Sequence, residues 1–436
     1  MIHAAPPRRQ GFASTLRRPG VGRLVARTAG FNVASTAAAG LGGVILARVL
    51  GPTVRGEYAA ITAWFGVVLV VGSMGQPAAL CFHVAADPDR ARDYVATSRA
   101  MMLVTGTVVL IAGIAVAPLL AHGQPEVTTG YRLAFGASIV AFIGASYTFS
   151  LQARDLHRWN VVRVSQPVLS LIAIGVLWRL RLLSLEAAMI VLAGTMVLQL
   201  GWAYHCCRIT GLAPGLARAR LVRPLSSYGI AQIAALTPAT LNAQLDQLVL
   251  SQAVPSADLG RYAIAVSLTL LPIPVVSAIG NVAFPRLASS TGSSMSTYRV
   301  QQLAVLGAAA LATGFLCPLA LGAYWLVPMV FGAGYRGVVP LLWIMTPGAI
   351  WLACNQVVGD VLRGRKLPIV VARAEGIAVV FTIVLLFAML PFIGVYSAAI
   401  ASTIAYAVAL MVMLRHVWVP SRISARRARH RLGMEP

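Results

Sequence analysis

The chain has 436 residues, of which 58% are hydrophobic and 11% are charged, and its formal net charge is +23. Soluble globular chains average about 25% charged residues, so this composition excludes a water-soluble fold and makes the lipid bilayer the solvent. The arginines are spread over short loops and both tails, which argues against a nucleic-acid partner.

Apolar segments long enough to cross a bilayer recur along the whole chain. Their length favours helices, because barrel strands are shorter and backbone groups in lipid need hydrogen bonds within the segment. The expected fold is therefore all-α and integral to the membrane, with about twelve transmembrane helices. In chain order they are 24–49, 56–83, 96–121, 128–152, 160–180, 184–206, 226–250, 258–287, 299–323, 336–362, 367–391 and 393–418.

The basic residues orient these helices. With the N-terminus inside, the inner regions hold 28 Lys and Arg residues and the outer loops hold 7. Cytoplasmic loops carry this excess in membrane proteins, and it attracts anionic lipid of the inner leaflet. We expect a multi-pass protein of the inner (plasma) membrane with both termini in the cytoplasm.

Two corners of the chain repeat each other. The stretch "LARVLGPTVRGEYAA" at 46–60 is echoed by "LSQAVPSADLGRYAIA" at 250–265, where Gly56 falls on Gly260 at an offset of 204. A second echo, "RWNVV" and "KLPIV", follows at an offset of 208. The order of the matches and the equal helix counts predict two six-helix bundles related by a parallel repeat.

This repeat divides the chain into segments. The linker is basic and interrupted by Pro and Gly residues, which predicts a bent segment at the membrane interface on the cytoplasmic side. The expected segments are a basic N-terminal tail (1–23), an N-lobe of six helices (24–208), the linker (209–225), a C-lobe of six helices (226–418) and a basic C-terminal tail (419–436).

Signatures of an enzyme are missing from the sequence. No nucleotide-binding loop and no metal-ligand spacing occurs among the five cysteines and seven histidines, so we expect no catalytic residue, metal or cofactor. Asp87, Asp89 and Asp93 alternate with arginines, which favours a solvated, self-paired loop over an acidic metal site.

Polar residues inside the first and seventh helices recur every three or four positions. They predict one face on each helix, directed either to a shared interior or to close helix packing. The faces consist of Thr28, Asn32, Ser35, Ala39 and Gly42, and of Tyr228, Gln232, Ala235, Ala239, Asn242 and Asp246.

Two of the acids lie more than three residues inside a predicted span. Asp246 is near the outer end of its helix and Glu375 is deep in the eleventh. Carboxylates are costly in lipid, so both are candidates for cation coupling. The alternatives are that Asp246 reaches the interface and that Glu375 pairs with an arginine. Asp360, beside Arg363, is expected to form a structural ion pair.

Arginines near the span ends could bind an anionic substrate through their planar donor fork. The candidates are Arg23, Arg27, Arg48 and Arg261. Arg27 begins the polar face of the first helix from the cytoplasmic side. The alternative for all of them is snorkelling to lipid headgroups.

Five stretches, in this order, resemble the Wzx-type polysaccharide flippases of the multidrug/oligosaccharidyl-lipid/polysaccharide (MOP) superfamily. They are "ILARVLGPTVRGEYAAI", "LDQLVLSQAVPSADLGRYAIAVSL", "AFPRLA", "MVFGAGYRGVVPLLWIM" and "NQVVGDVLRGRKLP". The resemblance spans about residues 24–418. It implies a V of two bundles around a central cavity lined mainly by helices 1, 2, 7 and 8.

The resemblance also implies a function. Such proteins move undecaprenyl-diphosphate-linked oligosaccharide to the outer leaflet by alternating access driven by an ion gradient, beside other polysaccharide-assembly proteins. The polar faces of the first and seventh helices fit this cavity, so the candidate substrate-binding residues are Arg27, Asn32, Ser35, Gln232, Asn242 and Asp246. The candidate cation-coupling residues are Asp246 and Glu375. The chain departs from the family by having no arginine between Arg55 and Arg90 and few intramembrane acids, which leaves the coupling open.

Other functions remain as alternatives. One alternative is a multidrug or small-molecule exporter of the same superfamily, which would need acidic residues in its cavity. Another is a transporter whose cargo is a lipid-linked peptidoglycan precursor. An integral-membrane polysaccharide polymerase would need a sizeable outer loop, whereas the longest outer connections are about ten residues.

Overall fold

A computed structural model describes residues 21–213, 215–277, 279, 295–365 and 367–418. These residues form helices joined by short turns, with no strand among them. The helices are α2 (Val21–Gly72), α3 (Gln76–Ala86), η1 (Pro88–Arg90), α4 (Ala91–Leu120), α5 (Pro125–Arg154), α6 (Leu156–Arg179), α7 (Leu185–Ile209), α8 (Ala219–Ala253), α9 (Ser256–Thr269), α11 (Met295–Phe331), η2 (Ala333–Tyr335), α12 (Val338–Gly364), α13 (Pro368–Ile393) and α14 (Tyr396–Trp418).

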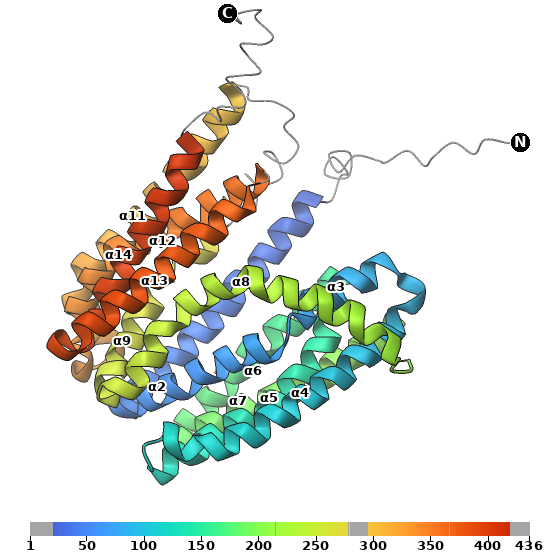
Figure 1. The fold of residues 1–436 in the computed structure, drawn as a ribbon. Helices are drawn as coiled ribbons and strands as arrows, with labels where there is room; N and C mark the ends of the chain where they lie inside the picture. Colours follow the sequence, from blue (N-terminus) through green and yellow to red (C-terminus); the bar gives the residue numbers. More distant parts are fainter. Residues whose placement is uncertain (1–20, 214, 278, 280–294, 366, 419–436) are drawn as a thin grey trace, which may run out of the picture.

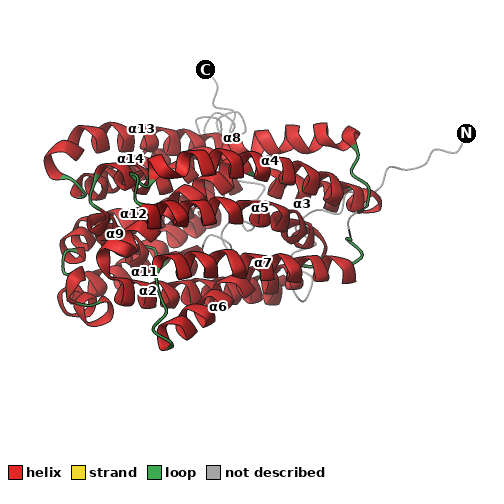
Figure 2. Cartoon of the chain, turned by 90° about the horizontal axis from the view of Figure 1, so that it is seen from below, coloured by secondary structure: helices red, strands yellow, loops and turns green. Residues whose placement is uncertain are grey.

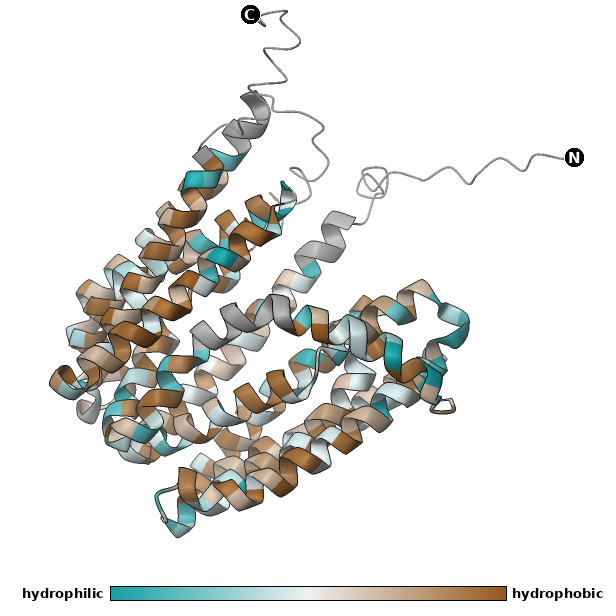
Figure 3. Ribbon diagram, viewed as in Figure 1, coloured by the Kyte–Doolittle hydropathy of each residue, from teal (hydrophilic) through white to brown (hydrophobic). Residues whose placement is uncertain are grey.

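The predicted number of membrane spans agrees with these helices. Within the described residues, ten helices are long and apolar enough to cross a membrane. One of them, α2, is two helices joined at Gly51, and the 35-residue α8 fills the place of the seventh span. Hydrophobic residues line the middles of the helices and hydrophilic residues gather at their ends (Figure 3), as a bilayer requires. The chain is a multi-pass membrane protein.

The helices form two lobes that meet at one end and diverge at the other (Figure 1). They meet where α2 turns at Gly51 and where α8 joins α9 at Val254, which we call the corner end. They diverge toward the start of α2 and the end of α14, which we call the open end. Figure 2 shows the helices of both lobes running side by side along this direction.

The hydrophobic core explains this shape. One buried cluster, centred on residues such as Ile61, Tyr131, Tyr262 and Leu342, draws side chains from both lobes. At the open end the N-lobe has its own cluster around Tyr147 and Leu225, and a separate C-lobe cluster lies on α12, α13 and α14. The lobes therefore share their main core at the corner end, while the start of α8 packs against the N-lobe at the open end.

The two repeated sequence corners pack directly against each other. A side chain on Gly56 would lie 1.7 Å from the backbone oxygen of Ser256, and one on Gly260 would lie 2.0 Å from that of Pro52. Any Cβ at these positions would collide with backbone, so only glycine permits the crossing. The same motif is present in both lobes because the lobes touch through it.

Hydrogen bonds between the lobes reinforce the corner end. The hydroxyl of Tyr335 donates to the carbonyl of Ala47 at 3.0 Å. Nη1 of Arg48 lies 3.2 Å from the carbonyl oxygen of Met329 and 3.4 Å from that of Val330, near the C-terminus of α11. A cation is favourable there because helix carbonyls are unsatisfied at that end.

The second helix of the N-lobe is interrupted, which the prediction of one span over 56–83 missed. The chain turns at residues 73–75, where Met74 and Gly75 have φ values of 47° and 65°. A side chain on Gly75 would lie 2.1 Å from the oxygen of Gly229 on α8. The break lets the backbone of α8 approach this closely.

The corresponding helix of the C-lobe is also interrupted. The prediction placed one span over 258–287, but α9 ends at Thr269, where the turn reaches Pro272. Proline lacks the N–H that would continue the helical hydrogen-bond ladder. Residues 280–287, which end that predicted span, lie outside the described residues.

The acidic loop fastens the linker between the lobes. Asp87 pairs with Arg90 at 3.8 Å, as expected for a self-paired loop. Asp93 instead reaches Arg218 at 2.5 Å and accepts from the backbone N–H of Leu216 at 3.3 Å. These contacts hold the linker, and with it the start of α8, against the N-terminus of α4.

Candidate functional site

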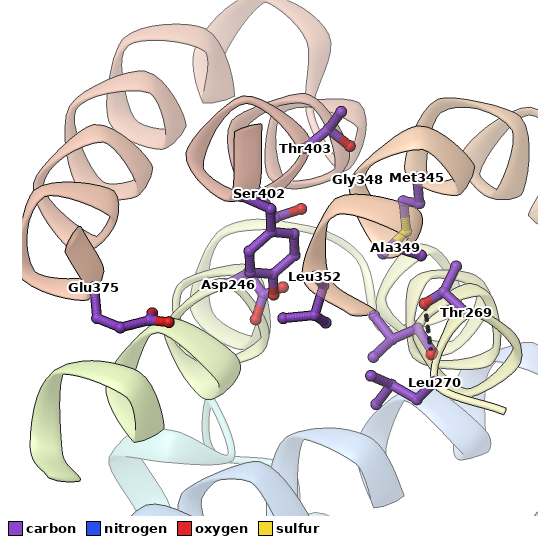
Figure 4. A pocket seen from close by; sticks show the side chains of 12 residues that line it. Asp246, Thr269, Leu270, Met345, Gly348, Ala349, Leu352, Glu375, Ser402 and Thr403 are labelled. Carbon is purple, nitrogen blue, oxygen red and sulfur yellow. Dashed lines mark hydrogen bonds between the residues drawn. The ribbon is translucent and has the colours of Figure 1, made fainter. Parts of the chain in front are cut away.

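Asp246 and Glu375 line one cavity inside the C-lobe. The cavity has a volume of about 160 Å³ and is bounded by residues of α8, α9, α12, α13 and α14. Asp246 enters it from α8 and Glu375 from α13, and both carboxyls face the same space (Figure 4). The fold thus brings together the two acids singled out in the sequence.

Buried hydrogen bonds fix the Asp246 carboxyl. Its side chain is 5% exposed. The hydroxyl of Tyr262 donates to Oδ2, and the backbone N–H of Gln247 donates to Oδ1 at 2.8 Å. Tyr262 is itself fully buried and comes from the repeated corner motif, so the motif that joins the lobes also positions the acid.

Hydroxyl groups complete the polar lining. Thr269 donates to the carbonyl of Val266 at 2.8 Å, and Thr403 donates to that of Ile344 at 3.1 Å. Because both hydroxyl protons are donated to backbone carbonyls, the hydroxyl oxygens can act only as acceptors toward the cavity. Tyr406 lines the same cavity. Carboxylate and hydroxyl oxygens suit a hard cation or a proton.

A polar seam joins α2 to α6 near the open end. Arg27 Nη2 lies 3.3 Å from Nε2 of His157. The amide of Asn160 donates to the Thr28 hydroxyl at 2.9 Å. These bonds direct the start of the first-helix polar face toward α6 within the N-lobe, and they leave the Arg27 side chain exposed.

Arg163 is a second exposed cation of this seam. It lies 3.4 Å from Oδ1 of Asn32, and its guanidinium lies 4.4 Å from the centroid of the Trp159 ring. Arg163 is not among the arginines that the sequence suggested as candidates for anion binding. Its signal is an arginine inside the predicted span 160–180, where a charge requires a partner.

The remaining candidates occupy different positions. Ser35 on α2 and Gln232 on α8 are half-buried. Asn242 belongs to α8, but its side chain lies outside the described residues, as does that of Arg23. Arg48 and Arg261 bind locally at the corner end, Arg48 as described above and Arg261 to Asp258 at 2.7 Å.

Asp360 pairs with Arg363 at 2.9 Å, which confirms the expected structural ion pair. Among the described residues, no group of three or more His, Cys, Asp or Glu side chains could hold a metal ion.

Comparison with known proteins identifies the family. The sequence profile of a family described as "polysaccharide biosynthesis protein" matches residues 25–291. The chain belongs to this family. No match is found among curated proteins. The resemblance inferred from the corner motifs is confirmed.

Solved structures share the fold of this polysaccharide biosynthesis family member. An inward-facing multidrug resistance MATE transporter of the MOP superfamily matches with a TM-score of 0.76 at 14% identity, covering 90% of this chain and 96% of that one. The lipid II flippase MurJ in an inward closed conformation matches with a TM-score of 0.72 at 12% identity, covering 89% and 87%. The MOP-superfamily fold is therefore shown.

A third solved structure also shares the fold. An outward-facing MATE transporter matches with a TM-score of only 0.62 at 13% identity, covering 93% of this chain and 96% of that one.

Proposed function

We propose that the protein is a flippase that moves undecaprenyl-diphosphate-linked oligosaccharide from the inner to the outer leaflet for surface polysaccharide synthesis. It works by alternating access and catalyses no covalent reaction. A glycan cannot cross hydrocarbon, whereas a polyprenyl tail can remain in it. A V that is open at one end can hold the polar head while the tail stays in lipid.

The exposed guanidinium groups of the α2–α6 seam carry this proposal. Arg27 and Arg163 lie near the open end, and neither is paired with a carboxylate among the described residues. Arginine binds phosphate oxygens through two parallel N–H donors. Two such groups suit a diphosphate, with Asn32, Ser35, Gln232 and Asn242 as further candidate contacts to the head group.

The acid cavity supplies the coupling site in this proposal. A cation or proton bound by Asp246 and Glu375 neutralises the buried charge and alters the packing of α8 against α13. The cavity volume of about 160 Å³ is below the 300–1,000 Å³ typical of sites for drug-sized ligands. This favours an ion there over the small-molecule cargo of a multidrug exporter.

The proposed location is the inner membrane, with both termini in the cytoplasm. The excess of Lys and Arg in the inner regions supports this orientation. The open end then faces the cytoplasm, where lipid-linked oligosaccharide is available. Anionic lipids of the inner leaflet and other polysaccharide-assembly proteins are the expected partners.

The test is the leaflet location of lipid-linked oligosaccharide in a deletion strain. An impermeant glycan-labelling probe is applied to intact cells and to inverted vesicles. We expect cargo to accumulate on the inner leaflet, wild type to reverse this, and Arg27→Ala and Arg163→Ala to reverse it poorly. Arg132→Ala, which removes an exposed arginine of α5, is the matched control and should behave as wild type.

Normal sidedness of the lipid pool in the deletion strain would refute the flippase. Export of small cationic compounds would then be the better proposal. It is checked by the drug sensitivity of the same strain.

A further inference from the structure

A second cavity lies inside the N-lobe, away from the acid cavity of the C-lobe. It has a volume of about 180 Å³ and is lined by residues of α2, α6 and α7. Small residues of α2, such as Ala38 and Gly42, form one wall, and Ile174 of α6 forms another. Neither the seam at the open end nor the proposed coupling site uses this space.

Arg55 lines this cavity as a buried and unpaired charge. Its side chain is 9% exposed, and its Nε atom is buried without a hydrogen-bond partner. The ion pairs of the described residues do not include Arg55. Its guanidinium lies 5.4 Å from the centroid of the Tyr58 ring, a contact that does not use the N–H donors.

The neighbouring polar groups add donors rather than a compensating charge. Gln166 donates one amide hydrogen to the hydroxyl of Ser170 at 3.3 Å, which leaves its other N–H available. The Ser170 oxygen lies 3.0 Å from that of Thr195, whose own proton goes to the carbonyl of Val191 at 2.8 Å. No carboxylate lines the cavity.

We propose that this N-lobe cavity is an anion-binding site in which Arg55 holds a halide or a phosphoryl group. An arginine remains protonated in proteins, and a buried charge without a partner is costly. A bound anion removes that cost and takes up the free N–H donors. Water occupies about 30 Å³ per molecule, so the cavity accommodates an anion with part of its hydration shell.

The probe for a free anion is bromide. Crystals of the full chain grown in sodium bromide should show an anomalous scattering peak within hydrogen-bond distance of the Arg55 guanidinium. In phosphatidylcholine nanodiscs, replacing gluconate by chloride or phosphate should raise the melting temperature by about 2–4 °C. Arg55→Met should abolish this shift, whereas Arg48→Met should retain it.

The probe for a lipid phosphoryl group is the nanodisc composition. A melting temperature that rises with phosphatidylglycerol at constant gluconate, again only when Arg55 is present, assigns the site to a headgroup. If neither salt nor lipid shifts the wild-type melting temperature and no bromide peak appears at Arg55, the site holds water only and the proposal is overturned. Should Arg55→Met fail to fold, these wild-type measurements decide the question.

Discussion

At the scale of single residues, the acid cavity depends on one hydrogen bond that the sequence pattern did not predict. In the sequence, Tyr262 belongs to a repeated corner motif, and Asp246 is an acid within a predicted span. In the structure the tyrosine hydroxyl donates to the buried carboxyl. A helix-face pattern cannot predict this contact, because the two residues lie on different helices, α8 and α9.

We expect Tyr262→Phe to lower the free energy of unfolding by about 1–3 kcal/mol, since it leaves a buried carboxyl short of a donor. Thermal unfolding in detergent measures this. Tyr228→Phe is the control, because no hydrogen bond to that half-buried hydroxyl occurs among the described residues, and it should unfold like wild type. Equal stability of both variants would contradict the assigned role of the Tyr262 hydroxyl.

The two acids should act as one unit. Asp246→Asn and Glu375→Gln preserve shape while removing charge, and each should reduce flipping about tenfold, equivalent to about 1.4 kcal/mol. The double variant should be little worse than either single variant, because residues of one site are not additive. Leaflet labelling measures the rate. Fully additive losses would show that the acids act independently.

At the scale of helices, close backbone approaches determine how the lobes join. Gly56 and Gly260 allow α2 and α9 to cross at the corner end, and Gly75 allows α8 to pass the break after α2. The sequence indicated the glycines as part of a repeat. It could not indicate that the repeated motifs are in contact, because a repeat gives similarity and not position.

Gly56→Ala is expected to destabilise the protein by about 1–3 kcal/mol or more, as overpacking does, since its Cβ would overlap the oxygen of Ser256. Gly40→Ala is the matched control in α2. A side chain there meets nothing within 4 Å, so helix propensity should stabilise it by about 0.5–1 kcal/mol. Melting temperatures in one detergent compare them. A harmless Gly56→Ala would refute the close crossing.

At the scale of the whole molecule, the lobes share their main core at the corner end. At the open end one cluster joins the N-lobe to the start of α8, and another lies within the C-lobe. Alternating access requires the shared contacts to part and the open end to close. Tyr335, Arg48 and Gly334 all reach across the corner end. In the proposed mechanism, they are the contacts that outward opening must break.

A disulfide across the corner end should therefore stop transport. A side chain on Gly334 would lie 3.2 Å from Cγ of Pro52, so Pro52→Cys combined with Gly334→Cys brings two thiols together. Under oxidant, flipping should fall to the level of the deletion strain, and reductant should restore it. Pro52→Cys alone should remain active throughout. Undiminished flipping by the cross-linked protein would show that the corner end does not open.

The sequence by itself determined that the protein is surrounded by the lipid bilayer. It also determined the number and order of the membrane spans and the two-lobed repeat. These features depend on apolar length, on charge asymmetry and on local motifs, all of which are written along the chain. It also indicated the family and the acids Asp246 and Glu375, because a carboxylate in a lipid-spanning segment is rare enough to be informative on its own.

Only the tertiary structure decided which of these groups meet. It brought Asp246 and Glu375 into one cavity, and it paired Arg27 with His157 and Arg163 with Asn32. Among the residues that the structure describes, it left Arg55 buried without a counter-ion. It also showed that two predicted spans are interrupted. One breaks at residues 73–75, where the backbone of α8 approaches, and the other breaks after Thr269, near Pro272. Contacts between helices far apart in the chain depend on how two bundles pack, and that packing follows from shape complementarity rather than from any local pattern.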